Sequence, residues 1–336
     1  MRKRYLYIFS IIAALGAMQL YASCISDKAS AAADSNVGTQ SQPDSVVQID
    51  TNKIPDGKFG EQVRYGRQLM LHTAYYIGPD GIDGKYLGNK MNCTNCHQDA
   101  GTKPFSLNLV TAFRNYPSYR AREGRVLTLA ERINNCIMHP HLGKPLPLDS
   151  KVMVALMSYL KWLSDSCNVD KHTVGLKNVA ISFPDTAASP AAGAVLFAKN
   201  CARCHGDNGQ GKMRSDNVCY QYPPLWGLKA YQPGSSMHRI IKLAQWLKSN
   251  MPYDKATHNN PFLTDAQALD LAAFINDDKI HKRPLVKEYQ YPNPEEKAID
   301  YDRGPFKDHF SDEQHKYGPY KPIIDYWKAR GVEPGF

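Results

Sequence analysis

Two copies of one short pattern constrain this chain of 336 residues more than any other feature. Residues 93–97 read Cys-Thr-Asn-Cys-His and residues 201–205 read Cys-Ala-Arg-Cys-His, so both have the form C-x-x-C-H. This form is typical of covalent attachment of a c-type haem, in which two thiols bond the porphyrin and the next residue faces the iron. The sequence therefore predicts two covalently attached haem c groups, with these attachment cysteines and proximal ligands: Cys93, Cys96 and His97, then Cys201, Cys204 and His205.

The other uses of paired cysteines fit less well. Neither motif has a second ligand pair at zinc-finger spacing, and neither follows a strand as a thioredoxin-like dithiol would. The eight cysteines of the chain are too few and too unevenly spaced for a disulfide scaffold. A bond between Cys167 and Cys219 is left open.

The N-terminus has the layout of a secretory signal. A basic start, Arg2 to Arg4, precedes an apolar run over residues 6–18 and small residues before Cys24. The run is shorter than the ~20 residues of a membrane span. We expect a signal peptide over 1–23 and, in preference to simple cleavage or retention, a lipid on Cys24 as in bacterial lipoproteins. The protein is then periplasmic or exported, and this lipid is its one expected contact with a membrane.

The charge of the chain narrows the class of partner. The formal net charge is +9, and loss of the three basic residues of the signal leaves +6. This excess suits small anions or an acidic partner. The sequence has no basic helix, finger or aromatic platform typical of nucleic-acid binding, so no nucleic-acid partner is expected.

The two motifs begin 108 positions apart, which predicts an all-α fold of two tandem cytochrome c-like domains with an irregular C-terminal wrapping extension. Helical spacing of Phe59, Val63, Gly66 and Met70 precedes the first motif, and an Ala-rich helix over 190–200 precedes the second. The expected segments are a flexible tether over 24–53, a first domain with haem 1 and the active site over 54–180, a second with haem 2 for electron transfer over 181–280, and the extension over 281–336.

A closing helix is expected in each domain. In the first, Asp149 is predicted to cap a helix with an apolar face. In the second, Thr264 and Gln267 form a capping box ahead of the closing helix. Another capping box, Thr128 and Glu131, predicts a helix after the first motif.

Two methionines are candidates for the sixth ligand of the second iron. Met251 lies before Pro252, which ends the preceding helix and holds the thioether in a loop. Met237 is the rival, but its helical spacing with Ile240 and Ala244 favours core packing. Met251 is the preferred ligand.

In the first domain, the candidate sixth ligand is Cys136, on the apolar face of the helix that begins after Thr128. A buried free cysteine is usually inert. Here Arg120, Arg122 and Arg132 create a cationic setting that favours a thiolate, which is both an iron ligand and a nucleophile. The fallback ligands are Met138, His139 and His141.

Longer segments of the chain resemble one family. They lie on both sides of the two motifs and are, among others, 73–78 (TAYYIG), 88–93 (GNKMNC), 99–105 (DAGTKPF), 119–122 (YRAR), 132–136 (RINNC), 143–150 (GKPLPLDS), 223–227 (PPLWG), 250–252 (NMP), 304–306 (GPF) and 310–315 (FSDEQH). In these segments the chain resembles the periplasmic dihaem thiosulfate dehydrogenases, which also act as tetrathionate reductases.

The resemblance implies a ligand set. It implies a His/Cys pair, His97 with Cys136, at the active-site haem and a His/Met pair, His205 with Met251, at the second. The chain departs from the family over residues 137–143, which read IMHPHLG where the family runs Arg-Ser-Met-Asn-Gly. That change bears on substrate affinity or the preferred direction of reaction.

We therefore expect an oxidoreductase that interconverts thiosulfate and tetrathionate by two-electron transfer, with Cys136, Arg120, Arg122 and Arg132 at the catalytic site. A soluble or membrane cytochrome would exchange the electrons. Two alternatives are kept: an electron-carrier cytochrome without a substrate, and a relative of the cytochrome subunit of the Sox sulfur-oxidising system.

Overall fold

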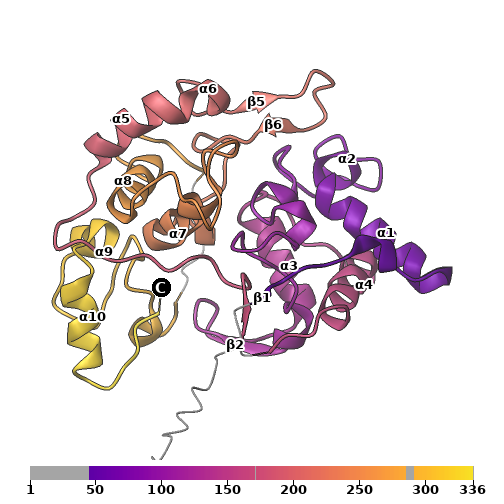
Figure 1. Cartoon of the computed structure of the whole chain (residues 1–336), viewed down its shortest axis with the longest axis horizontal. Helices are drawn as coiled ribbons and strands as arrows, with labels where there is room; N and C mark the ends of the chain where they lie inside the picture. Colours follow the sequence, from indigo (N-terminus) through magenta and orange to yellow (C-terminus); the bar gives the residue numbers. More distant parts are fainter. Residues whose placement is uncertain (1–44, 171, 285–290, 336) are drawn as a thin grey trace, which may run out of the picture. The chain divides into compact units, whose positions relative to one another are not determined.

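A computed structural model describes residues 45–170, 172–284 and 291–335 of the chain. Helices dominate it and strands are short, as expected for an all-α protein (Figure 1). The signal peptide and Cys24 lie outside the described residues, as does most of the expected tether. Within the described part, every helix is too short or too polar to cross a membrane.

The first half of the fold surrounds the motif at 93–97. Its helices are α1 (Gly57–Leu71), α2 (Thr73–Ile77), α3 (Leu129–Met138) and α4 (Lys151–Asp165). Its strands are β1 (Ser45–Val46), β2 (Ser118–Arg120), β3 (Arg125–Leu127) and β4 (Thr173–Val174). Short 3-10 turns lie at Thr51–Lys53, Cys93–Asn95, Asp99–Gly101 and Phe113–Asn115.

The second half surrounds the motif at 201–205 and includes the C-terminal residues. Its helices are α5 (Pro190–Asn200), α6 (Ala202–His205), α7 (Ile240–Asn250), α8 (Asp265–Ile275), α9 (Asp312–Tyr317) and α10 (Lys321–Lys328). Strands β5 (Lys212–Met213) and β6 (Tyr220–Tyr222) form a hairpin, and 3-10 turns lie at Ser236–His238 and Pro294–Glu296.

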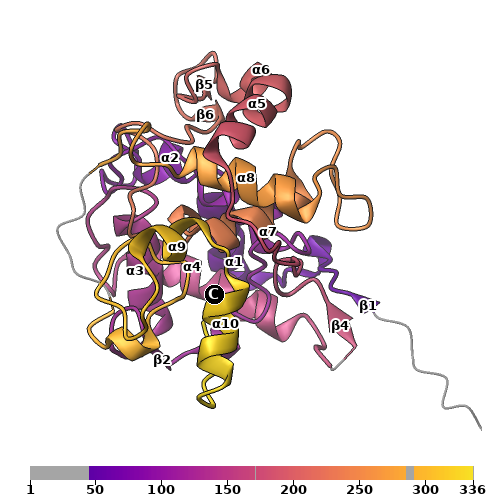
Figure 2. The same cartoon turned by 90° about the vertical axis from the view of Figure 1, so that its left-hand side faces the viewer.

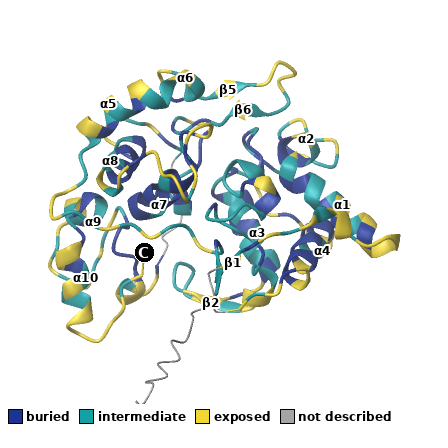
Figure 3. Ribbon diagram, in the orientation of Figure 1, coloured by how far each residue is buried: buried dark blue, intermediate teal, exposed yellow. Residues whose placement is uncertain are grey.

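Each half has its own apolar core (Figure 3). The first core joins α1 to α4 and includes Val63, Leu69 and Tyr159. The second joins α5, α7 and α8 and includes Phe197 and Ile241. Each core contains the helix that the sequence predicts before its motif, α1 in the first half and α5 in the second. Of the four residues at helical spacing before the first motif, Phe59 is the exception, because 43% of it is exposed.

In each half, two helices cross at a glycine, α1 with α4 in the first half and α5 with α8 in the second. A Cβ on Gly66 of α1 would lie 2.1 Å from the Ala155 carbonyl oxygen of α4. A Cβ on Gly193 of α5 would lie 2.0 Å from the Asp270 carbonyl oxygen of α8. The helices therefore touch backbone to backbone, which only glycine permits.

The helix starts largely agree with the sequence. Both capping boxes, at Thr128 and at Thr264, are present. The cap expected at Asp149 is wrong by one residue, because the Ser150 side chain accepts the hydrogen bond from the Met153 amide. Serine and aspartate are comparable N-caps, so the sequence alone did not separate these neighbours.

Ordered structure begins earlier than the expected boundary at Ile54. Strand β1 pairs in parallel with β4, as Figure 2 shows, and Val47 is 3% exposed. Residues 45–53 therefore pack on the first half instead of belonging to a tether. No sequence pattern marks this segment, because a two-residue strand followed by one buried valine has no periodicity.

The C-terminal extension packs on the second core, as the sequence predicts. Tyr317 of α9, Tyr320 just before α10 and Ile323 of α10 belong to that core. The Asp300 carboxylate reaches the start of α7, where it accepts hydrogen bonds from Arg239 Nε at 2.8 Å and from the Ile241 amide at 3.0 Å. The extension is therefore part of this fold and not a third domain. Helix α9 was not predicted, since its six residues are too short for a helical pattern.

Candidate active site and haem cavities

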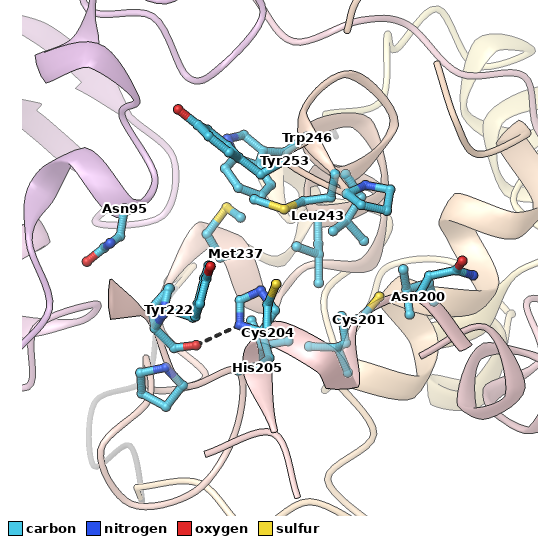
Figure 4. A pocket seen from close by; sticks show the side chains of 18 of the residues that line it. Asn95, Asn200, Cys201, Cys204, His205, Tyr222, Met237, Leu243, Trp246 and Tyr253 are labelled. Atoms are coloured by element: carbon cyan, nitrogen blue, oxygen red, sulfur yellow. Dashed lines mark hydrogen bonds between the residues drawn. The ribbon is translucent and has the colours of Figure 1, made fainter. Parts of the chain in front are cut away.

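The second motif lies at a mainly apolar cavity with an empty volume of about 1060 Å³. Figure 4 shows Cys204 and His205 on one side of the cavity and Leu243 on the other. Leu247, Leu271 and Ile275 complete much of the apolar lining. Two thiols and an imidazole beside an apolar cavity are the donor set and the surroundings that a covalently held haem needs.

The orientation of His205 fits an iron ligand. Its Nδ1 is 2.8 Å from the carbonyl oxygen of Pro223, drawn as a dashed line in Figure 4. Because a carbonyl only accepts, Nδ1 carries the proton and Nε2 keeps the lone pair that a metal requires. Burial lowers the pKa of His205, which also favours the neutral ring.

Both candidate methionines line this cavity. Met251 follows the last residue of α7, as the sequence predicts. Met237 does not lie on α7, as its spacing had suggested, because Ser235 caps a separate 3-10 turn with a hydrogen bond from the Met237 amide at 3.3 Å. Met237 is 6% exposed and packs in the core. The preference for Met251 as ligand stays a prediction.

The first motif lies at a cavity of about 1460 Å³. Cys93, His97 and Cys136 line it together with apolar side chains of α1, α3 and α4, which are Met70, Leu129, Ile133, Ile137, Leu156 and Leu160. His97 Nδ1 is 2.6 Å from the Leu107 carbonyl oxygen, so its other nitrogen, Nε2, keeps the lone pair. The residues present again fit a haem.

Cys136 and His97 both line this cavity, and the surroundings of Cys136 favour its thiolate form. Arg132, one turn earlier on α3, places Nη1 3.4 Å from the Cys136 sulfur. Burial raises the pKa of Cys136, but nearby positive charge, chiefly that of Arg132 with a smaller contribution from Arg122, outweighs burial and lowers that pKa to about 6. The thiolate can ligate iron and can act as a nucleophile.

A smaller cavity of about 460 Å³ adjoins Cys136 and is called the polar cavity for the arginine, histidine and serine side chains in its lining. From the first half it is lined by Arg122, Arg132 and His139, and from the second by Ser235 and Ser236. Two half-buried arginines beside a thiolate make this cavity suitable for a small anion.

Contacts between the two halves hold Arg122 in place. Its guanidinium donates to the Gly234 carbonyl oxygen at 3.1 Å and to the Ser236 hydroxyl at 2.8 Å. Close by, Trp246 Nε1 of α7 donates to the Cys96 carbonyl oxygen of the first motif at 3.1 Å. The polar cavity is therefore completed by the second half of the fold.

Comparisons with known proteins agree with this geometry. Residues 190–278 match the cytochrome c family, and residues 85–169 match the cytochrome c domain of the SoxA/TsdA family. The thiosulfate dehydrogenase of Stutzerimonas stutzeri is 35% identical over 265 residues, which are 79% of this chain and 79% of that protein. The chain belongs to the thiosulfate dehydrogenase family.

Two further thiosulfate dehydrogenases are also similar to this chain. That of Allochromatium vinosum is 30% identical over 70% of this chain and 83% of its own length. Among solved structures, the TsdBA thiosulfate dehydrogenase of Marichromatium purpuratum in its "as isolated" form matches with a TM-score of 0.61 and 32% identity. The match covers 68% of this chain and 48% of that one, so this chain spans about half of it. The chain is thus an oxidoreductase with two cytochrome c domains, which imply haem c cofactors.

The structure brings together some of the expected site residues of this thiosulfate dehydrogenase family member. Cys136, Arg122 and Arg132 line the polar cavity, whereas Arg120 is exposed on β2 and does not line it. Arg120 ends β2 and Arg122 lies in the turn that follows, so the rule that residues two apart share a face of a strand does not apply to this pair. A catalytic role for Arg120 stays a prediction without geometric support.

Of the fallback ligands, the two histidines of the segment 137–143 lie in different places. His139 lines the polar cavity. His141 is buried, with Nε2 3.8 Å from the Cys93 sulfur. Cys167 and Cys219 are free thiols, so the structure contains no bond between them.

Sequence reasoning missed Gln232, Ser235 and Ser236. They lie in a loop of the second half and reach the site of the first. No motif marks them, and their place follows from how the two halves pack.

Proposed function

We propose that this protein is a dihaem c-type cytochrome that couples two thiosulfate ions into tetrathionate with release of two electrons, or runs the reverse reaction. One observation carries the proposal: the Cys136 thiol lies where the first haem cavity meets a cavity lined by Arg122 and Arg132. The names of the relatives at 30–35% identity support the choice of thiosulfate.

The proposed cofactors are two haem c groups attached through Cys93 and Cys96 and through Cys201 and Cys204. The axial pairs would be His97 with Cys136 and His205 with Met251. When bound, haem c takes up electrons singly, so two groups hold both electrons of the coupling.

The arginines bind the substrate. Thiosulfate is a dianion, and two of them repel each other inside a buried cavity. Arg132 and Arg122 offset this repulsion and offer paired N–H donors to the sulfonate oxygens. Arg122 is already fixed by Gly234 and Ser236, so little ordering remains on binding.

Cys136 carries the covalent step. Its thiolate and the outer sulfur of one thiosulfate form an S–S bond, which gives a Cys136 S-thiosulfonate and releases two electrons. The outer sulfur of the second thiosulfate then attacks the substrate-derived sulfur of that bond. Tetrathionate forms, and Cys136 leaves as the thiolate, so atoms and charge balance.

The test is the Cys136→Gly exchange. Both haems should remain attached, as a pyridine haemochrome assay measures, and the spectrum of the second haem should persist. Turnover should fall by several orders of magnitude, because a covalent participant is lost. Turnover is measured with thiosulfate plus ferricyanide and with tetrathionate plus reduced viologen. A dihaem variant with near wild-type rate in both assays would reject the mechanism and favour the electron-carrier alternative.

We also propose where the protein works and what takes its electrons. The signal layout and Cys24 support an exported, periplasmic protein anchored by a lipid. A soluble or membrane cytochrome would then exchange electrons with the second haem. Cys24→Ser should move the protein from the membrane fraction to the soluble fraction. An unchanged distribution would reject the anchor.

A further inference from the structure

Glu123 adds a carboxylate to the surroundings of the polar cavity. It follows Arg122 in the turn between β2 and β3. Its Oε1 accepts a hydrogen bond from Asn135 Nδ2 at 2.8 Å, and Asn135 lines the polar cavity. Asn135 also directly precedes Cys136 on α3. One hydrogen bond therefore connects the carboxylate to the wall of the cavity next to the thiol.

The second oxygen of this carboxylate is buried without a partner. Oε2 of Glu123 receives no hydrogen bond within the described part of the chain. A buried carboxylate oxygen without a donor is costly unless positive charge nearby offsets the loss of water. The charge of Glu123 is therefore only partly offset by direct contacts, and it acts on the charged groups around it.

Those groups are the two arginines of the cavity. The pKa of Arg132 is raised, chiefly by the thiolate of Cys136 and in smaller part by Glu123. The pKa of Arg122 is lowered by burial, and the charge of Glu123 opposes that shift. Both effects are those of a carboxylate close enough to attract the two guanidinium groups.

The formal charges around the cavity then cancel. Arg122 and Arg132 are positive, whereas the Cys136 thiolate and Glu123 are negative. An incoming dianion is attracted by the arginines and repelled by the two negative groups. Cys136 takes part in the proposed reaction, but Glu123 forms and breaks no bond in it. The repulsion from Glu123 therefore acts on substrate and product alike.

We propose that Glu123 is an affinity-setting residue, whose carboxylate is the counter-charge of Arg122 and Arg132 and limits how tightly the polar cavity holds sulfur oxyanions. This inference rests on the proposed function. Two thiosulfate dianions enter the coupling and one tetrathionate dianion leaves, because two negative charges depart as electrons. A site with arginines alone would bind that product strongly and release it slowly. Glu123 weakens the binding of both ions, which favours turnover.

The test measures anion binding without turnover. Sulfate is the probe, because it is a tetrahedral dianion like thiosulfate but has no outer sulfur to couple. We expect Glu123→Gln to lower the Kd of sulfate for the oxidised holoprotein, measured by calorimetric titration, by about threefold or more. The glutamine oxygen can still accept the hydrogen bond from Asn135, so the exchange removes the charge and keeps the shape. KM for thiosulfate should fall in the same direction.

Further variants separate charge from shape. Glu123→Asp keeps the charge and should bind sulfate no more tightly than wild type. Glu123→Ala removes the charge together with the side chain and should tighten binding, which decides the question if Glu123→Gln does not fold. Glu61→Gln, at an exposed position of α1, makes the same change in net charge and should leave the Kd unchanged. The two haem spectra and the midpoint of urea unfolding check that each variant is folded.

The outcomes distinguish the two proposals. If Glu123→Gln and Glu123→Ala bind sulfate no more tightly than wild type, while wild type turns over thiosulfate, the role of Glu123 is wrong and the proposed function stands. An equal gain in Glu61→Gln would also reject the role, since the effect would then come from net charge. If wild type binds sulfate but turns over neither thiosulfate nor tetrathionate, the proposed function fails, and the sulfate Kd values still decide whether Glu123 opposes anion binding.

Discussion

His97 and His205 are oriented in the same way, although they lie in different halves of the chain. Each Nδ1 contacts a backbone carbonyl oxygen, that of Leu107 in one case and that of Pro223 in the other. The contact fixes the ring and leaves on Nε2 the lone pair that a metal requires. Cys136 and the methionines are thus the residues that make the two sites chemically different.

Met251 and Met237 give a test at the second site. We expect Met251→Gly to remove the long-wavelength sulfur-to-iron band of the His/Met haem and to lower its reduction potential, because the thioether ligand is lost. Absorption spectra and a redox titration of the holoprotein measure both effects. Met237→Gly is the matched control and should cost stability only. Loss of the band in Met237→Gly alone would reverse the assignment.

His139 also links the site to pH. Burial and the charges of Arg122 and Arg132 lower the pKa of His139 from 6.5 to about 4. Between these values the unfolded chain binds more protons, so this contribution to stability is full above pH 6.5 and is lost as the pH falls toward 4. The loss is up to about 3 kcal/mol. His139→Gln should lack it, so its free energy of urea unfolding should fall less between pH 7 and pH 4.5. Equal falls would contradict the burial of a neutral ring.

At the scale of elements, two helix crossings support the two haem cavities. Helices α1 and α4 flank the first cavity, and α8 contributes Leu271 and Ile275 to the second. Because each crossing is a direct backbone contact at Gly66 or Gly193, the distance between its helices is fixed. The cavities therefore depend on residues that do not line them.

Gly66→Ala tests this dependence. Alanine favours a helix by about 1 kcal/mol over glycine, but its Cβ cannot fit 2.1 Å from the Ala155 oxygen. The helices must separate, and we expect a net loss of about 2–3 kcal/mol in the free energy of unfolding of the holoprotein. Glu61→Ala, at an exposed position of the same helix, should change it by less than about 0.5 kcal/mol. A Gly66→Ala protein as stable as wild type would show that α1 can shift freely.

At the scale of the whole molecule, parts distant in sequence complete one another. Ser235 and Ser236 from the second half line the polar cavity of the first, and Gln232 donates to the Met138 carbonyl oxygen at the end of α3. Asp300 from the C-terminal extension holds Arg239 at the start of α7. Neither half, taken alone, contains the whole proposed active site.

Asp300→Ala tests the role of the extension. Asp300 is 2% exposed and Arg239 is 8% exposed, so the exchange leaves a buried guanidinium without its partner. We expect a loss of about 3–5 kcal/mol in the free energy of unfolding, measured by urea denaturation followed by circular dichroism. Lys321→Ala is the control, since its ion pair with Asp185 is largely exposed and should contribute less than about 1 kcal/mol. Equal effects of the two exchanges would mean that the extension adds only surface contacts.

Local chemistry in the sequence was enough for the capping boxes, the two helical cores and the placement of Arg132 beside Cys136. These depend on residues within a few positions of each other, where helix geometry fixes which side chains meet. Local patterns failed where two adjacent residues could both cap a helix, as at Asp149 and Ser150. They also failed where a segment was too short to show a periodicity, as at Val47.

The tertiary structure alone decided which arginines reach Cys136 and what completes their cavity. Arg120 and Arg122 look alike in the sequence, yet only Arg122 is enclosed, because Ser236 and Gly234 accept its hydrogen bonds. Gln232 and His139 are 93 residues apart in the chain and 2.9 Å apart in space. Contacts of this kind carry no periodic signal, since they arise from packing two separately folded cores against each other.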